Sequence, residues 1–238
     1  MPVQEEWVAT PDCKLYTRTW LPDKLKATVV FVHGLGEHVT RYDEMFGRFA
    51  DNGIKVTAFD QRGHSMGGGL TLGYALQNQK EFQGVIASAP LVDSGDKTKP
   101  KLADRILLSF VPYILPSFVI PNILDLSTLS RDPNEVALYK KDPLVHSYIS
   151  TGLCNDILTN GTNLLRNAKK FNLPLLVAHG TQDGMTCPKA SKKFVSLVSS
   201  NDKTYKEYEG FYHELHNEPR KDREIVYDTY INWITERI

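Results

Sequence analysis

Cysteine is scarce in this sequence of 238 residues. The three cysteines, Cys13, Cys154 and Cys187, lie far apart in the chain, and none belongs to a C-x-x-C pair. This usage argues against a disulfide framework and against a zinc site, and it fits a reducing compartment. We therefore expect a protein that works without a metal ion.

The sequence also lacks an excess of charge of either sign, because 28 basic residues balance 28 acidic ones. A balanced chain has no overall basic field to attract nucleic acid, so we expect no nucleic-acid partner. The first residues are acidic where a secretory signal would be basic and then apolar. The sequence thus predicts a cytoplasmic location.

Long apolar runs without a break are missing as well. The most apolar stretch, residues 106–124, contains Pro112, Pro116 and Pro121. Each proline removes a backbone hydrogen bond and clashes with the preceding turn, so a membrane-spanning helix is not expected. Two interpretations remain, an apolar cap over a site or ordinary helices buried on the main sheet, and we favour the cap.

What the sequence does contain is a G-x-S-x-G pattern at Gly63–Gly67, followed by a run that is compatible with a helix. In a nucleophile elbow, glycines relieve crowding so that a serine hydroxyl stands at the tip of a strand-to-helix turn. We therefore predict Ser65 as a nucleophile. The backbone N–H groups of Met66 and Leu35 are the natural donors to the oxyanion that such a nucleophile generates.

A serine nucleophile needs an imidazole to take its proton and a carboxylate to orient that imidazole. Asp183 follows an apolar strand and is the candidate acid. Two histidines near the end of the chain, His213 and His216, compete for the role of base on spacing alone. The order Ser, acid, His is that of an α/β-hydrolase.

The rest of the chain predicts an α/β fold with a mainly parallel sheet. Two β-rich runs at 7–10 and 14–20 predict a hairpin, and the apolar run 27–32 predicts a strand buried on both faces. Further strands are expected at 54–59, 83–89, 173–178 and 204–208, with helices at 41–52, after the elbow, at 188–199 and at 222–238. We expect one domain, with core segments 1–90 and 173–238 and a cap insertion at 91–172.

Motifs spread over almost the whole chain resemble those of the monoacylglycerol lipase family of serine hydrolases, and most of all its fungal members. The motifs are His33–His38 with Arg41-Tyr42, Phe59–Gly63, His64–Gly68, Tyr139 before Asp142–Leu144, His179–Asp183 and Tyr212–Glu218.

The resemblance implies an enzyme without a cofactor that cleaves a monoacylglycerol or a related lipid ester into glycerol and fatty acid. It implies peripheral association with a membrane or a lipid droplet. It also implies the triad Ser65, Asp183 and His213, and so selects His213 over His216. A polar recess for the glycerol head is implied at four further residues: Glu37, Arg41, Tyr139 and His216.

One departure from the family is large. The family has about fifty residues between the Asp-Gln-Arg-Gly segment and the Gly-His-Ser elbow, including a central strand, whereas five steps join Asp60 to Ser65 here. Gly63 must serve both motifs. We expect the strand at 28–32 to pair directly with the strand at 83–87, which would close the gap.

That departure leaves other functions open. A non-catalytic remnant that binds lipid is one alternative. A short-chain esterase or an acyltransferase on the same scaffold is another.

Overall fold

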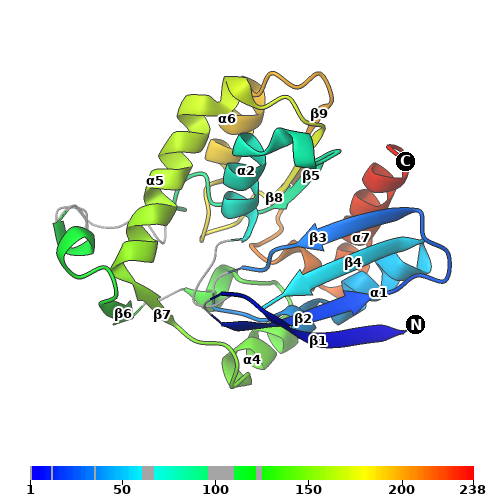
Figure 1. The fold of residues 1–238 in the computed structure, drawn as a ribbon, viewed down its shortest axis with the longest axis horizontal. Coiled ribbons are helices and arrows are strands. Elements are labelled where there is room, and N and C mark those ends of the chain that lie inside the picture. Colours follow the sequence, from blue (N-terminus) through cyan, green and yellow to red (C-terminus); the bar gives the residue numbers. More distant parts are fainter. Residues whose placement is uncertain (1, 12, 35, 61–66, 96–109, 122–124) are drawn as a thin grey trace.

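The structure, a computed structural model, describes residues 2–11, 13–34, 36–60, 67–95, 110–121 and 125–238 (Figure 1). Its strands are β1 Val3–Ala9, β2 Lys14–Trp20, β3 Ala27–Phe31, β4 Ile54–Phe59, β5 Val85–Ser88, β6 Val119–Pro121, β7 Tyr148–Ser150, β8 Leu175–Gly180 and β9 Lys203–Tyr208. Its α-helices are α1 Asp43–Asp51, α2 Gly67–Gln77, α4 Pro133–Lys141, α5 Thr151–Asn167, α6 Pro188–Leu197 and α7 Arg220–Thr235. Most elements thus lie within a few residues of their predicted positions.

The first half of the chain forms a four-stranded sheet in the order β1-β2-β4-β3. β1 and β2 pair antiparallel from Val3↔Trp20 to Ala9↔Lys14, so the predicted hairpin is confirmed. β3 and β4 pair in parallel, from Ala27↔Ile54 to Phe31↔Ala58. The motif that begins at His33 follows the carboxyl end of β3.

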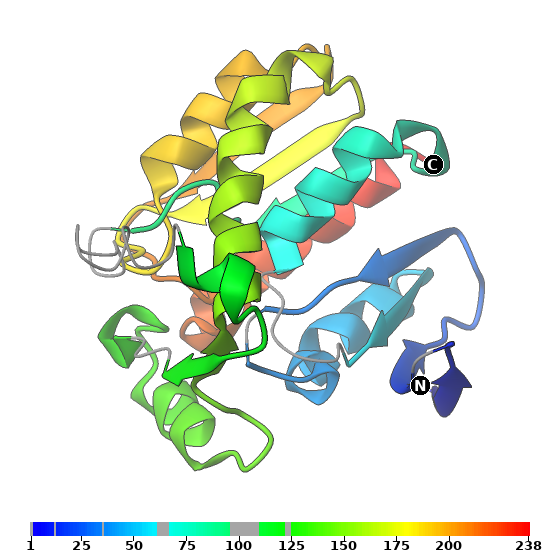
Figure 2. The same ribbon diagram turned by 60° about the vertical axis from the view of Figure 1, so that its left-hand side comes forward.

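The second half forms a parallel sheet in the order β5-β8-β9. All six residues of β8 are buried, and alternate side chains point to opposite faces. Leu175 and Val177 pack in one core cluster with α2, α5 and α6, whereas Leu176 and Ala178 pack in another with α1 and α7. Helices therefore cover both faces of this sheet (Figures 1 and 2).

The expected pairing of the two halves is wrong. β3 pairs with β4 alone and β5 with β8 alone, so the described strands of the two halves form two separate sheets where we predicted one. The reason lies in the helix layer, because α1 and α7 form one apolar cluster with both halves, including Val56 of β4 and Ala178 of β8. Helices anchored to both halves do not allow the strands to slide together.

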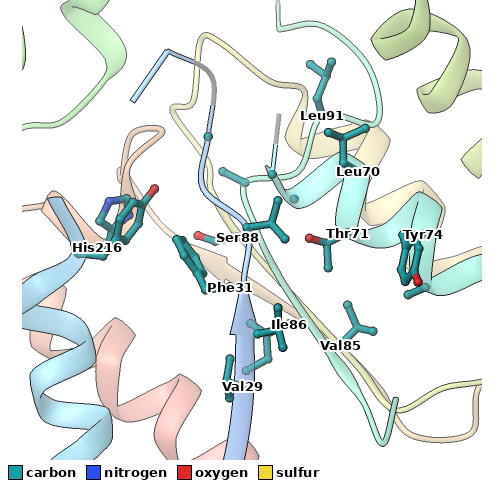
Figure 3. A pocket seen from close by; sticks show the side chains of 18 of the residues that line it. Val29, Phe31, Leu70, Thr71, Tyr74, Val85, Ile86, Ser88, Leu91 and His216 are labelled. Carbon is teal, nitrogen blue, oxygen red and sulfur yellow. The ribbon is translucent and has the colours of Figure 1, made fainter. Parts of the chain in front are cut away.

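A cavity of about 1160 Å³ occupies the space where the two sheets fail to meet (Figure 3). Val29 and Phe31 of β3 line one side, and Ile86 and Ser88 of β5 line the other. The cavity continues toward the carboxyl ends of these strands, where it is also lined by His213.

The cavity also corrects the prediction that residues 27–32 form a strand buried on both faces. β3 is only partly buried, and Val30 is 62% exposed. A central strand is buried when it has a neighbour on each side and a helix layer on each face. β3 has one neighbour, so part of its apolar surface faces the cavity.

The 91–172 segment contains the short antiparallel pair β6–β7, then α4 and α5. α5 packs on α2, where Asn160 donates to the backbone oxygen of Gly69 at 2.9 Å. The same amide leaves no space for a side chain at Gly73, whose added Cβ would lie 2.4 Å from Asn160 Oδ1. None of the helices in the described ranges combines the length and the apolar character that crossing a membrane requires.

Candidate active site

Two of the three predicted triad residues meet at the carboxyl end of the second sheet. Asp183 lies in the turn after β8, and His213 lies in the loop after β9. His213 Nδ1 is 2.8 Å from Asp183 Oδ2. The carboxylate is buried, whereas 27% of the histidine side chain is exposed and lines the cavity. The pair therefore has the geometry of an acid that orients a base facing a pocket.

The turn after β8 holds the Asp183 carboxylate firmly. The backbone N–H groups of Met185 and Thr186 donate to Oδ1 at 2.8 and 3.0 Å, and the Thr186 hydroxyl donates to Oδ2 at 2.7 Å. His179 Nε2, from β8 itself, is 3.0 Å from the same Oδ2. Sequence reasoning missed His179 and Thr186 as partners of Asp183, although the i, i+4 spacing of His179 and Asp183 within the quoted motif is a usable signal.

These contacts determine the protonation of the pair. Burial would raise the pKa of Asp183, but the charge of His213 and the hydrogen bonds of His179 and His213 outweigh it and hold the pKa well below its usual value. Burial would lower the pKa of His213, but Asp183 outweighs that effect and raises it. The acid is thus ionised, and the base has a strengthened affinity for a proton.

The cap region positions the histidine loop. The backbone N–H of His213 donates to Thr128 O at 3.0 Å, and that of Glu214 donates to Leu129 O at 2.8 Å. Both acceptors belong to the 91–172 segment. A segment far from His213 in sequence therefore fixes the position of the loop that carries this histidine.

Three of the predicted recess residues form one buried cluster beside this pair. Arg41 makes a bidentate ion pair with Glu214, at 2.7 Å for both contacts, and a 2.6 Å contact with Glu37. The Arg41 guanidinium also lies over the ring of Tyr139, 4.7 Å from its centroid. Burial alone would raise the pKa of Glu214, but Arg41 outweighs it and lowers the pKa to about 2. Glu214 is a member that sequence reasoning missed.

His216, the fourth predicted recess residue, lies at the edge of this cluster. Its ring stacks on Tyr42 at 4.4 Å between centroids, and the Tyr42 hydroxyl donates to Glu37 at 2.6 Å. Burial lowers the pKa of His216 to about 4, so the imidazole is neutral at pH 7. Its Nε2 atom is buried without a hydrogen-bond partner among the described residues, and His216 lines the cavity.

The predicted nucleophile Ser65 and the predicted oxyanion donors Leu35 and Met66 lie outside the described residues. The nearest described anchor is Gly67, where α2 begins. An added Cβ at Gly67 would lie 2.1 Å from Val32 O and 2.5 Å from His33 O, so only glycine allows this contact. The start of α2 therefore packs directly on the carboxyl end of β3.

The fold and this pair of residues define the class of protein. A solved monoglyceride lipase from Saccharomyces cerevisiae superposes with a TM-score of 0.91 at 24% identity, covering 100% of this chain and 97% of that one. A monoacylglycerol lipase from Paleococcus ferrophilus superposes with a TM-score of 0.87 at 26% identity, covering 94% of this chain and 99% of that one. The chain has the α/β-hydrolase fold.

The family follows from the sequence match. The model described as "Serine aminopeptidase, S33" (Hydrolase_4) matches residues 23–64 and 63–220. A putative monoglyceride lipase of Schizosaccharomyces pombe is 34% identical over 93% of this chain and 71% of its own length. The chain belongs to this family of hydrolases.

Another relative is much longer than this chain. An uncharacterized abhydrolase domain-containing protein of Dictyostelium discoideum is 38% identical over 94% of this chain. This chain spans only 28% of the length of that relative.

The comparisons also bear on the short join. The two segments that match the family model overlap at Gly63 and His64, and the overlap includes the glycine that we expect to serve both motifs. The alignments with the Dictyostelium and Schizosaccharomyces relatives run over 267 and 269 positions, more than the 238 residues of this chain. Positions that the relatives possess are therefore absent here.

Proposed function

We propose that this chain is a serine esterase that cleaves monoacylglycerol into glycerol and a fatty acid. The 2.8 Å contact between Asp183 and His213, which lines the cavity, is the observation that carries the proposal. The names of several relatives, including the Schizosaccharomyces pombe protein, support the substrate class.

In this mechanism Ser65 attacks the ester carbonyl while His213 takes its proton. The ionised Asp183 stabilises the imidazolium that forms, and the N–H groups of Leu35 and Met66 donate to the oxyanion. His213 then gives its proton to the leaving glycerol oxygen. Water hydrolyses the acyl-enzyme by the same steps, and no cofactor takes part.

The polar recess suits the glycerol head. Arg41 is already neutralised by two carboxylates, so it holds Glu37 and Glu214 in place and is not a free cation. The unpartnered Nε2 of neutral His216 is available to bond a glycerol hydroxyl. Glu37 and Tyr139 line the same cavity, beside the apolar walls that would receive the acyl chain.

We further propose that the cap region brings the protein to lipid surfaces. Several large apolar side chains there are more than half exposed: Phe110, Tyr113, Ile114, Leu115 and Phe118. Such a group can enter a membrane or lipid-droplet interface without spanning it. These exposed side chains support peripheral attachment.

A labelled fluorophosphonate tests the activated serine directly. We expect labelling of the wild-type chain and none of Ser65→Ala, with unchanged circular dichroism. Ser196→Ala, an exposed position on α6, is the matched control and should label normally. Labelling that survives in Ser65→Ala would overturn the assignment of the nucleophile.

The divided sheet favours a second candidate, a lipid-binding protein without turnover. The described residues contain no strand that would support the elbow, and the two half-sheets do not pair. In that case the fluorophosphonate would not react, while a fluorescent monoacylglycerol ether would still bind. The two outcomes separate the candidates.

A further inference from the structure

The cavity lies between two strand edges that lack partners. β3 is the last strand of its sheet and β5 the first strand of the other, so each pairs on one side only within the described chain. Residues of both strands line the same cavity (Figure 3). Unpaired edges that face each other across a cavity are ready to pair with an added strand.

The two edges point in the same direction. The carboxyl end of β3 meets the start of α2, where Gly67 packs on Val32 and His33. The carboxyl end of β5 meets the same turn of α2, because an added Cβ on Gly68 would lie 3.1 Å from Ser88 O. A single strand between them could therefore pair in parallel with both.

The faces of the cavity are apolar on both sides of the sheet. α2 contributes Tyr74 from one layer, and α7 contributes Tyr230 and Trp233 from the other. Val30 of β3 is 62% exposed and Tyr74 is 54% exposed, although both lie beside the core. Side chains on both faces of an inserted strand would meet apolar surface, as in the centre of a parallel sheet.

Hydrogen bonding distinguishes a strand from a lipid chain as the occupant. The free edges of β3 and β5 present backbone N–H and C=O groups, each of which needs a partner when buried. An acyl chain would cover these groups without bonding them, whereas an extended peptide would bond both edges. The indole N–H of Trp233, buried without a partner among the described residues, adds a polar atom that a lipid would also leave unsatisfied.

We propose that the cavity between β3 and β5 is a strand-acceptor site that binds an extended apolar peptide parallel to both strands. The occupant has the chemistry of a central strand, rich in β-branched residues and without proline. The relatives possess positions that this chain lacks, and the family model is interrupted between β4 and α2, which is the connection that precedes this gap in the sheet. The acceptor edges share their cavity with His213, but pairing with a peptide does not depend on an active serine.

The test uses the full chain and a synthetic peptide with about six valine and isoleucine residues, flanked by lysines for solubility. We expect saturable binding of one peptide per chain in calorimetry. At about a hundredfold excess over Kd, the midpoint of thermal unfolding should rise by roughly 5–10 °C. Amide exchange measured by mass spectrometry should slow in 27–31 and 85–88.

Two comparison ligands identify the occupant. The same peptide with alternate N-methylated residues keeps its apolar character but cannot pair, so we expect no binding. Decanoate below its micelle concentration tests the acyl chain. The proposal would be overturned if the N-methylated peptide bound as tightly as the strand peptide, or if the strand peptide did not bind. It would also be overturned if decanoate, and not the peptide, slowed amide exchange in 27–31 and 85–88.

A pair of variants localises the site. Val30→Glu places a charge where the strand would dock and should weaken peptide binding at least tenfold, with unchanged circular dichroism. Val8→Glu makes the same change on β1, at a 44% exposed position outside the cavity, and should leave binding unchanged. Equal affinities of the two variants would place the peptide elsewhere.

Discussion

The Asp183 carboxylate accepts hydrogen bonds from four residues, namely His179, Met185, Thr186 and His213. A buried carboxylate with this many donors remains ionised and does not rotate. Both properties are what a histidine base requires of its partner. At the scale of single residues, this half of the candidate triad is therefore preorganised.

We predict that Asp183 and His213 act as one unit. Asp183→Asn and His213→Ala should each lower kcat for a soluble ester by about 10³–10⁴-fold, because each change leaves the serine without an oriented base. The double variant should be hardly slower than either single one. Asp228→Asn, in a surface ion pair with Arg48, is the control and should retain activity. Additive losses would argue against a triad.

His216 should make the stability of the protein depend on pH. Burial lowers its pKa to about 4 in the folded state, against 6.5 for an ordinary histidine. Between these values the unfolded chain binds the additional proton, so the free energy of unfolding falls as the pH falls from 6.5 to 4.

The variant His216→Phe keeps a ring that can stack on Tyr42 but cannot be protonated. In denaturant titrations the free energy of unfolding of this variant should fall less than that of the wild type between pH 6.5 and pH 4. The difference should be on the order of 2 kcal/mol or less. Parallel curves for the two proteins would contradict the assignment.

At the scale of elements, the 91–172 segment serves two regions of the molecule. Its last helix, α5, joins the core through Leu164, which packs in one cluster with β5 and β8. Its earlier part supplies Thr128 and Leu129, which hold the histidine loop, and the exposed apolar side chains near Tyr113. The 91–172 segment therefore contacts both the core and the candidate site.

We predict that this apolar group binds lipid surfaces. Alkaline carbonate should release the protein from isolated membranes into the supernatant, and retention in the pellet would refute peripheral attachment. Tyr113→Ser with Ile114→Ser should weaken cosedimentation with phospholipid vesicles at least tenfold, because two large apolar side chains no longer enter the interface. Leu25→Ser, at a 60% exposed position outside the cap, is the matched control and should bind as the wild type does.

At the scale of the whole molecule, the divided sheet is the distinguishing feature. α1 and α7 connect the halves on one face, but the strands themselves leave a cavity of about 1160 Å³ between them. A cavity of that size removes packing contacts that a central strand would supply. Only five steps along the chain separate Asp60 from Ser65 in the sequence, and the described residues contain no strand between β4 and α2.

We predict that restoring the missing segment raises both stability and activity. A family-like helix and strand of about fifty residues, inserted between Gly63 and His64 with a glycine before the histidine, should pair with β3 and β5. The midpoint of thermal unfolding and kcat/KM should both increase. A glycine-serine insert of equal length is the control and should increase neither. Comparable values for the original and restored proteins would show that the segment is dispensable.

The sequence alone determined the local elements and the candidate chemistry. The hairpin, β4, β8 and α7 follow from the periodicity of apolar residues, which reflects the environment of each residue within its own segment. Motif resemblance grouped Asp183 with His213, and Arg41 with Glu37 and Tyr139, and the structure brings each group into contact. Sequence reasoning missed the partners His179, Thr186 and Glu214, because a hydrogen bond between two side chains does not change the pattern of apolar residues in either segment.

The tertiary structure alone decided how the halves of the sheet meet. Residues 27–32 have the pattern of a strand buried on both faces, yet Val30 is 62% exposed, because Ala27, Val29 and Phe31 face the core and the described elements leave the opposite face of β3 largely uncovered. A strand's own side chains encode its apolar character, whereas its neighbours depend on where the helix layers hold the rest of the molecule. In this protein α1 and α7 hold β3 and β5 apart, and that spacing is a property of the whole fold.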